Sequence, residues 1–181
     1  ILSMVGAIPA LLVMLKLRAE ERAGRTEHLL ARAVSRTQLM GSFMVLSMVV
    51  AAAMQVLSVL GLWSTAAAST VDPFPLGDTL LASLVYVPLI WILVGLAASL
   101  IGFAPKRAGL VWLYLGYTLF AVYFGNLLQL PDWMVKITPW GYIPNVPMEP
   151  IGASTIFVSL MVAAILIVLG LYGYKQRDIS G

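Results

Sequence analysis

The sequence predicts an all-α integral membrane protein, in which four full spans and one truncated N-terminal span form a single transmembrane domain over residues 1–181. Of the 181 residues, 61% are hydrophobic and only 10% are charged, and the mean hydropathy is +0.96. A soluble domain of this length would need far more charge to cover its surface. Four uncharged stretches also reach the roughly 20 residues that a helix needs to cross a bilayer. They are residues 39–63, 79–103, 109–128 and 153–174.

The chain opens with a shorter apolar stretch, residues 1–15. It falls short of the roughly 20 residues of a full span. It has no basic head and no convincing cleavage site, so a signal peptide is not indicated. We interpret this stretch as the end of a span whose beginning lies before Ile1.

The next segment, residues 16–38, is the only long polar run in the chain. It holds six of the eleven Lys and Arg residues together with three glutamates and the single histidine. It is rich in Ala, Glu, Arg and Leu, which favour a helix. Ser35 followed by Gln38, just before an apolar run, is the signature of a capping box. We therefore predict a polar helix, from Arg18 to Val34, and a new helix that starts at the capping box.

Prolines mark the expected interruptions further along the chain. A loop with two prolines and a glycine covers residues 64–78, and Pro88 should kink or break the span over residues 79–103. Residues 129–152 contain five prolines, so they cannot form one continuous helix, yet they are rich in Trp, Tyr and aliphatic residues. We predict short broken helices here that dip into the outer leaflet and return, as a re-entrant segment.

The basic residues predict the orientation. Ten of the eleven Lys and Arg fall in residues 16–38, in the turn at Lys106 and Arg107, or after the last span, and only Lys136 falls on the other side. Positively charged connections usually stay in the cytoplasm. This pattern places the polar segment and the C-terminus inside the cell and explains the net charge of +3 without nucleic-acid binding.

A search for catalytic and ligand-binding motifs is mostly negative. The chain has no glycine-rich loop with a lysine of the kind that binds the phosphates of ATP. It also has no cysteine, and its single histidine, His28, has no second histidine with which to share a metal ion. None of the four full spans contains His, Asp, Glu or Lys, so a membrane hydrolase would lack its base. Carriers driven by ion gradients usually need such residues within their helices. If the protein transports a compound, we expect the energy to enter from outside the membrane.

Two motifs resemble a known family. The pattern Glu-Glu-x-x-Gly-Arg-x-Glu-x-Leu-Leu-Ala-x-x-Val-Ser-Arg, residues 20–36, is similar to the cytoplasmic coupling helix of ABC-type export permeases of the polyketide-antibiotic and multidrug class. The tail over residues 172–179, Tyr-Gly-Tyr-Lys-Gln-Arg-Asp-Ile, resembles the end of the same permeases. Ala33 departs from the pattern, since such permeases usually have proline there.

The resemblance implies a cell-membrane permease that exports amphipathic compounds such as antibiotics and has no enzymatic activity of its own. It implies a separate ABC ATP-binding subunit, which would bind ATP and magnesium, and a second permease half or protomer. The implied ATPase-coupling residues are Glu20, Glu21, Gly24, Arg25 and Glu27, with no catalytic and no metal-binding residues in this chain.

A stripe of aromatic residues is the candidate substrate path. Tyr117, Phe120 and Phe124 share one helical face, with Tyr123 beside it. Aromatic side chains bind flat apolar compounds with little loss of entropy. Packing against neighbouring helices is the competing interpretation. Small residues at i, i+4 spacing, such as Gly95 with Ser99, indicate close helix packing.

Two other function classes stay open from the residues alone. The protein could be a non-transporting scaffold or assembly subunit whose polar loop recruits a cytoplasmic protein, or a carrier driven by an ion gradient. Substrate-stimulated ATP hydrolysis by a co-purified ATPase would separate an exporter from both.

Overall fold

The computed structural model describes residues 2–24, 35–70, 75–125, 127–143 and 152–176. Within these ranges the chain forms helices and no strand, and five helical stretches are long and apolar enough to cross a membrane. The predicted all-α membrane fold is confirmed. The five stretches are α1 (Leu2–Arg22), α3 (Arg36–Ser69), α4 (Leu76–Leu84) continued by α5 (Val87–Phe103), η1 (Pro105–Arg107) continued by α6 (Leu110–Phe124), and α8 (Ala153–Gln176).

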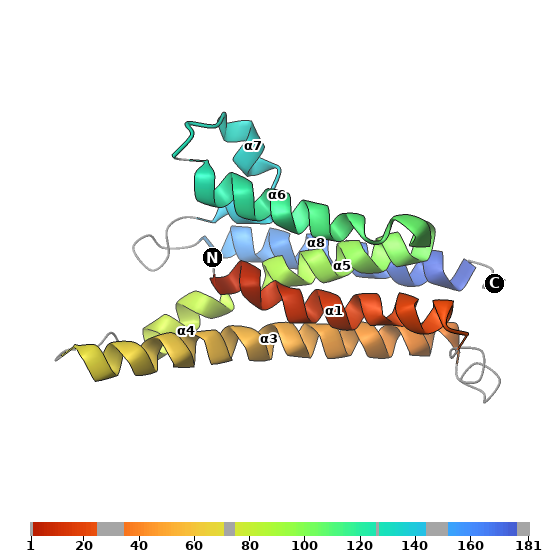
Figure 1. Ribbon diagram of the computed structural model, residues 1–181, viewed down its shortest axis with the longest axis horizontal. Coiled ribbons are helices and arrows are strands. Elements are labelled where there is room, and N and C mark those ends of the chain that lie inside the picture. Colours follow the sequence, from red (N-terminus) through yellow and green to blue (C-terminus); the bar gives the residue numbers. More distant parts are fainter. Residues whose placement is uncertain (1, 25–34, 71–74, 126, 144–151, 177–181) are drawn as a thin grey trace.

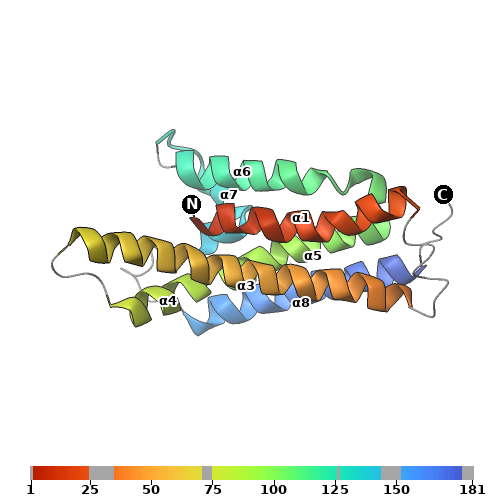
Figure 2. The ribbon, with the colours of Figure 1, turned by 60° about the horizontal axis from the view of Figure 1, so that its bottom comes forward.

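The long helices lie side by side in an elongated bundle (Figure 1, Figure 2). Helix α5 is at its centre and packs against α1, α3, α6 and α8. Seven of its side chains, spread over every turn, are at most 1% exposed and form the middle of the apolar core: Leu89, Ile90, Leu93, Val94, Ala97, Ala98 and Ile101. By contrast, much of α3 and α8 is exposed and apolar, as expected for helices that face lipid or another protein.

Helices α5 and α8 approach each other closely through small residues. A Cβ atom added to Gly95 would lie 2.8 Å from the Cβ of Leu166, and one added to Gly102 would lie 2.6 Å from the carbonyl oxygen of Gly170. The Ser99 hydroxyl donates a 2.7 Å hydrogen bond to the Leu166 carbonyl across the same contact. The predicted role of Gly95 and Ser99 in close helix packing is confirmed.

The helix break at Pro88 is also confirmed. Pro88 stands in the first turn of α5, and α4 ends at Leu84, so the break comes just before the proline. Proline removes the amide hydrogen that would bond the carbonyl four residues earlier, and its ring crowds that carbonyl. The Tyr86 amide instead donates to the Ser83 carbonyl over 3.0 Å, which tightens the connection.

The capping box at the start of α3 is present as predicted. The Ser35 hydroxyl accepts from the Gln38 amide at 3.2 Å, and the Gln38 side chain accepts from the Ser35 amide at 2.9 Å. The end of α3 differs from the prediction, because the helix continues through Ser69 and the expected loop starts later. Hydroxyls near this end, such as that of Ser64, bond back to carbonyls of their own helix, so they do not compete with it.

The prediction of one continuous polar helix from Arg18 to Val34 is wrong at Gly24. Helix α1 continues from the first apolar stretch without a break through Arg22, so its 21 residues are long enough to span a bilayer. The chain then turns, and Gly24 adopts a φ of +69°. Glycine accepts this left-handed conformation without strain and commonly ends helices. A helix that continues without a break through Gly24 is therefore excluded, and residues 25–34 lie outside the described ranges.

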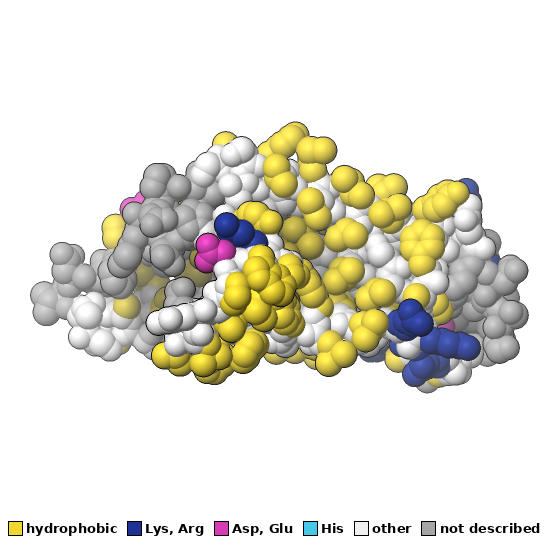
Figure 3. Space-filling view, turned by 90° about the horizontal axis from the view of Figure 1, so that it is seen from above, with side chains coloured by type: hydrophobic (Ala, Val, Ile, Leu, Met, Phe, Trp, Pro, Cys, Tyr) yellow, Lys and Arg dark blue, Asp and Glu magenta, His cyan; other side chains and the backbone are white. Residues whose placement is uncertain are grey.

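Charge is distributed unevenly along the bundle. The end of α1, the start of α3, the turn η1 and the end of α8 lie at the same end (Figure 1). These elements carry all but one of the Lys and Arg residues in the described ranges, and Lys136 stands apart in α7 (Asp132–Lys136). Figure 3 shows most of the basic side chains on one face gathered at that end, with apolar side chains across the middle. This is the separation that the sequence predicts.

Candidate functional site

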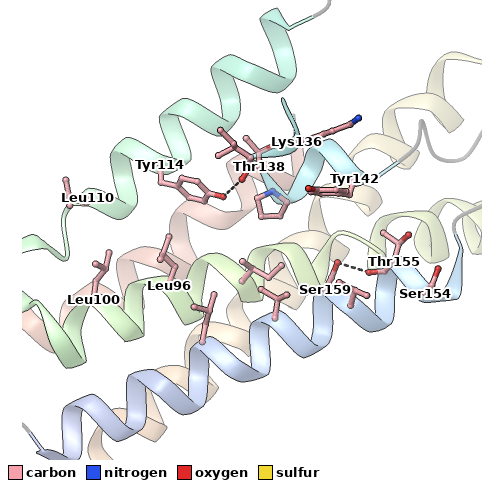
Figure 4. A pocket seen from close by; sticks show the side chains of 16 residues that line it. Leu96, Leu100, Leu110, Tyr114, Lys136, Thr138, Tyr142, Ser154, Thr155 and Ser159 are labelled. Atoms are coloured by element: carbon pink, nitrogen blue, oxygen red, sulfur yellow. Dashed lines mark hydrogen bonds between the residues drawn. The ribbon is translucent and has the colours of Figure 1, made fainter. Parts of the chain in front are cut away.

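A cavity of about 880 Å³ lies between α5, α6 and α8 (Figure 4). Its floor is α5, and α6 and α8 form its walls. Its roof is the segment that contains α7 and η2 (Pro139–Tyr142). The lining residues are Ile92, Leu96, Leu100, Leu110, Tyr114, Lys136, Ile137, Thr138, Pro139, Tyr142, Ser154, Thr155, Val158, Ser159, Val162 and Leu166. The volume is in the range of about 300–1,000 Å³ that is typical of small-molecule sites.

The roof is held in place by side chains from distant parts of the chain. The Tyr114 hydroxyl of α6 donates to the Ile137 carbonyl at 2.9 Å, and the Tyr117 hydroxyl donates to the Met134 carbonyl at 2.8 Å. From the other side, the buried indole of Trp140 donates a 3.0 Å hydrogen bond to the Ser3 hydroxyl of α1. Irregular backbone at membrane depth requires such partners.

The roof also depends on one close turn. A Cβ atom on Gly141 would collide with the backbone of Val135, so α7 and η2 can fold against each other only if this residue is glycine. The predicted short broken helices are therefore present over residues 132–142. Their depth in the outer leaflet stays a prediction, and residues 144–151 lie outside the described ranges.

The cavity is apolar toward one end and carries hydroxyl groups toward the other. Figure 4 shows Leu96, Leu100 and Leu110 at one end and Tyr142, Ser154 and Thr155 at the other, with Tyr114 and Ser159 between them. Among its described lining residues there is no carboxylate and no imidazole. Such a cavity can bind a compound with an aliphatic part and a polar part.

The predicted substrate-path residues lie beside this cavity rather than in it. Tyr117 contacts the roof through the bond described above. Phe120 and Phe124 stack with ring centroids 5.6 Å apart, Tyr123 meets Phe124 edge-on at 4.9 Å, and all three are exposed. None of the four lines the cavity. Their role in transport stays a prediction, and any contact they make with a substrate would be on the outer surface of α6.

The lining residues were not apparent from the sequence. Tyr114 is one turn before Tyr117 on α6, and this spacing could have extended the predicted stripe to it. Ser159 and Leu96 carry no signal in the sequence, because hydroxyl and aliphatic residues are common in membrane helices. Their importance comes only from the roof, which folds back over them.

The predicted ATPase-coupling residues are only partly described. Glu20 and Glu21 lie in the last turn of α1, at the basic end of the bundle, and Gly24 forms the turn that follows. Arg25 and Glu27 lie outside the described ranges. Coupling stays a prediction for all five. In the described part of the chain no three His, Cys, Asp or Glu residues come together in a way that could hold a metal ion.

Two comparisons with known proteins identify the family. The family model described as "Multidrug efflux system permease Rv1217c, C-terminal domain" matches residues 1–175. The chain is also 29% identical over 185 residues to the multidrug efflux system permease protein Rv1217c of Mycobacterium tuberculosis (strain ATCC 25618 / H37Rv). That match covers 98% of this chain and 33% of the relative, so the chain spans about a third of the relative's length. The resemblance to multidrug export permeases is thereby confirmed, and the chain belongs to the family of the C-terminal domain of multidrug efflux system permease Rv1217c.

Proposed function

We propose that this chain is the C-terminal membrane portion of an ATP-driven permease that exports amphipathic compounds, and that the cavity under the roof lies on the export route. The observation that carries the proposal is the cavity itself. It is large enough for a drug-sized compound, its walls are mostly apolar, and its few polar groups are gathered toward one end. The name of the relative, a multidrug efflux system permease protein, supports the same function.

The positions of the charged residues support an energy source outside the membrane. Residues 39–63, 79–103, 109–128 and 153–174 contain no ionisable Asp, Glu, His, Lys or Arg. A carrier that uses an ion gradient would need such a group to change its charge within the membrane. Most of the ionisable side chains in the described ranges lie instead at the basic end, where a soluble subunit could contact them. We place the ABC ATP-binding subunit there, with bound ATP and magnesium, against Glu20, Glu21 and the turn at Gly24.

The same proposal assigns the orientation and the second partner. The basic end faces the cytoplasm of the bacterial cell, in accordance with the positive-inside rule. The second permease half or protomer packs against apolar surface that this chain leaves exposed, of which α8 offers the most, including Phe157, Ile165 and Val168. Lipid covers the remainder.

Transport in inside-out membrane vesicles tests this proposal. The vesicles contain the full-length permease with its ATP-binding subunit, and the assay follows uptake of a panel of neutral, cationic and anionic fluorescent amphiphiles. We expect the uptake of at least one compound to require ATP and to continue when a protonophore is added. Leu96→Trp, which fills the cavity, should reduce this uptake several-fold. Leu113→Trp is the matched control, because Leu113 is exposed on α6 and does not line the cavity.

Each alternative class has its own result in this assay. Uptake that is abolished by the protonophore and unaffected by removal of ATP would show a carrier driven by an ion gradient. No uptake of any compound, with the permease and the ATP-binding subunit still assembled, would show a scaffold. Either result would overturn the proposed function.

A further inference from the structure

Two hydroxyl groups that extend into the cavity from opposite walls, those of Tyr114 and Ser159, have their protons engaged. The Tyr114 hydroxyl donates to the Ile137 carbonyl at 2.9 Å, and the Ser159 hydroxyl donates to the Thr155 carbonyl at 2.8 Å. A hydroxyl whose proton is engaged can still accept hydrogen bonds through its lone pairs. In the described part of the chain neither of these two oxygens accepts a bond. The cavity thus offers two acceptors to a ligand, and Figure 4 shows them extending from opposite walls.

A third hydroxyl beside these two, that of Thr138, is less available for hydrogen bonds to a ligand. Thr138 is fully buried, donates to the Val135 carbonyl at 2.8 Å and accepts from the Gly141 amide at 3.2 Å. Its hydrogen-bonding groups therefore serve the fold of the roof. In the middle of the cavity, between the leucines and the hydroxyls of Tyr142, Ser154 and Thr155, recognition of a polar group depends on Tyr114 and Ser159.

The charges around the cavity disfavour ionised ligands. A cation would enter without a counter-charge, since no described lining residue is acidic, and an uncompensated charge in an apolar site is costly. Beside Tyr114 and Ser159 an anion would meet hydroxyl oxygens whose protons are already donated. Among the described lining residues the only charged one is Lys136, and Figure 4 shows the side chain of this exposed residue pointing away from the cavity.

We infer that this cavity binds an uncharged amphiphile that carries hydroxyl or amide N–H donors beside an aliphatic body. The donors lie between Tyr114 and Ser159, and the aliphatic body extends along α5 past Leu96 toward Leu100. This inference rests on the proposed function, because it names the class of compound that the export route accepts. It also assigns the orientation, with the polar group toward the roof and the aliphatic part toward the basic end.

Photolabelling with three matched probes tests this inference. Each probe has the same dodecyl chain with a diazirine, and the head group is maltose, trimethylammonium or sulfate. The full-length permease is labelled in lipid nanodiscs without nucleotide, and labelled peptides are mapped by mass spectrometry. We expect the maltoside to label the peptides that contain residues 92–100 and 154–166 several-fold more than the two charged probes do.

Single hydroxyl deletions then test the two acceptors. Ser159→Ala should weaken binding of the maltoside probe roughly fivefold, the loss typical of one neutral hydrogen bond, and leave labelling by the charged probes unchanged. Ser159→Thr keeps a hydroxyl and should restore binding. Tyr114→Phe should lower labelling at least as much, because it also releases Ile137 of the roof. Tyr172→Phe removes a phenol that is exposed on α8 outside the cavity and should change nothing.

Two results would overturn the inference. One is equal or stronger labelling of these peptides by the trimethylammonium probe. The other is maltoside labelling that stays the same in Ser159→Ala, provided that the variant melts at the same temperature as the parent protein. The labelling uses no ATP and no ATP-binding subunit, so its failure would leave ATP-driven export intact. If transport in vesicles fails while labelling by the maltoside remains specific, the proposed function is refuted and the binding site for an uncharged amphiphile stands.

Discussion

The contact between α5 and α8 permits a sharp test of the packing, through the substitution Gly102→Ala. The added Cβ atom would lie 2.6 Å from the Gly170 carbonyl oxygen and 3.0 Å from the Tyr174 amide nitrogen. Ordinary contacts of this kind begin near 3.4 Å, so the two helices must move apart by about 0.8 Å. Both obstacles are backbone atoms, so no side chain can rotate to make room.

The expected cost follows from that displacement. Overpacking of a tight contact typically costs about 1–3 kcal/mol. Each kcal/mol corresponds to roughly 2–4 °C in melting temperature for 150–250 residues and to less for a longer protein, so we expect Gly102→Ala to lower the melting temperature of the full-length permease by up to roughly 12 °C. The assay is thermal denaturation of the full-length permease in detergent, followed by the loss of the folded peak in size-exclusion chromatography.

Gly116→Ala is the matched control for this prediction. Gly116 lies within α6, and nothing comes within 4 Å of a Cβ atom added there. Because alanine favours a helix over glycine by up to about 1 kcal/mol, this variant should melt at the parent temperature or slightly above it. If the Gly102→Ala variant melted at the same temperature as the Gly116→Ala variant, the close approach of α5 and α8 would be refuted.

Three further predictions concern the ends of the bundle. Trp140→Phe removes the bond to Ser3 and should loosen the roof, so that proteolysis within residues 129–152 becomes several-fold faster in nanodiscs, whereas unchanged cleavage would show that the bond does not hold the roof. Ser35→Ala deletes the side-chain cap of α3 and should cost about 1 kcal/mol, measured as a drop in melting temperature, and an unchanged melting temperature would contradict the role of the cap. In intact cells Ser69→Cys should react with an impermeant thiol reagent and Ser180→Cys should not; the reverse pattern would refute the orientation.

Sequence alone predicted the features that depend on short-range physics. The composition indicated a membrane protein, since 10% charged residues are too few to cover the surface of a soluble domain of this length. The break before Pro88 follows from the missing amide of one residue, and the capping box of α3 follows from two side chains three residues apart. The family resemblance rested on contiguous residues as well. Each of these signals is contained in a few neighbouring positions.

Two predictions failed because local propensity was judged without its surroundings. Residues 18–34 contain good helix formers, yet the left-handed conformation of Gly24 ends α1 just after Arg22. Residues 64–69 were predicted as the start of a loop because two prolines and a glycine follow them, yet their hydroxyls bond within α3 and the helix continues. In both cases the deciding factor was backbone hydrogen bonding, which residue composition does not specify.

The cavity was decided by tertiary structure alone. It exists because the segment over residues 132–142 folds back over α5, α6 and α8, and that return depends on bonds between residues far apart in the chain. Trp140 and Ser3 are separated by 137 positions and Tyr114 and Ile137 by 23. No periodicity within one helix can show such pairs, since periodicity reports which face of a helix is apolar and not which other segment will cover it. The apolar spans were therefore determined by the sequence pattern, and the site between them by long-range hydrogen bonds and by the close turn at Gly141.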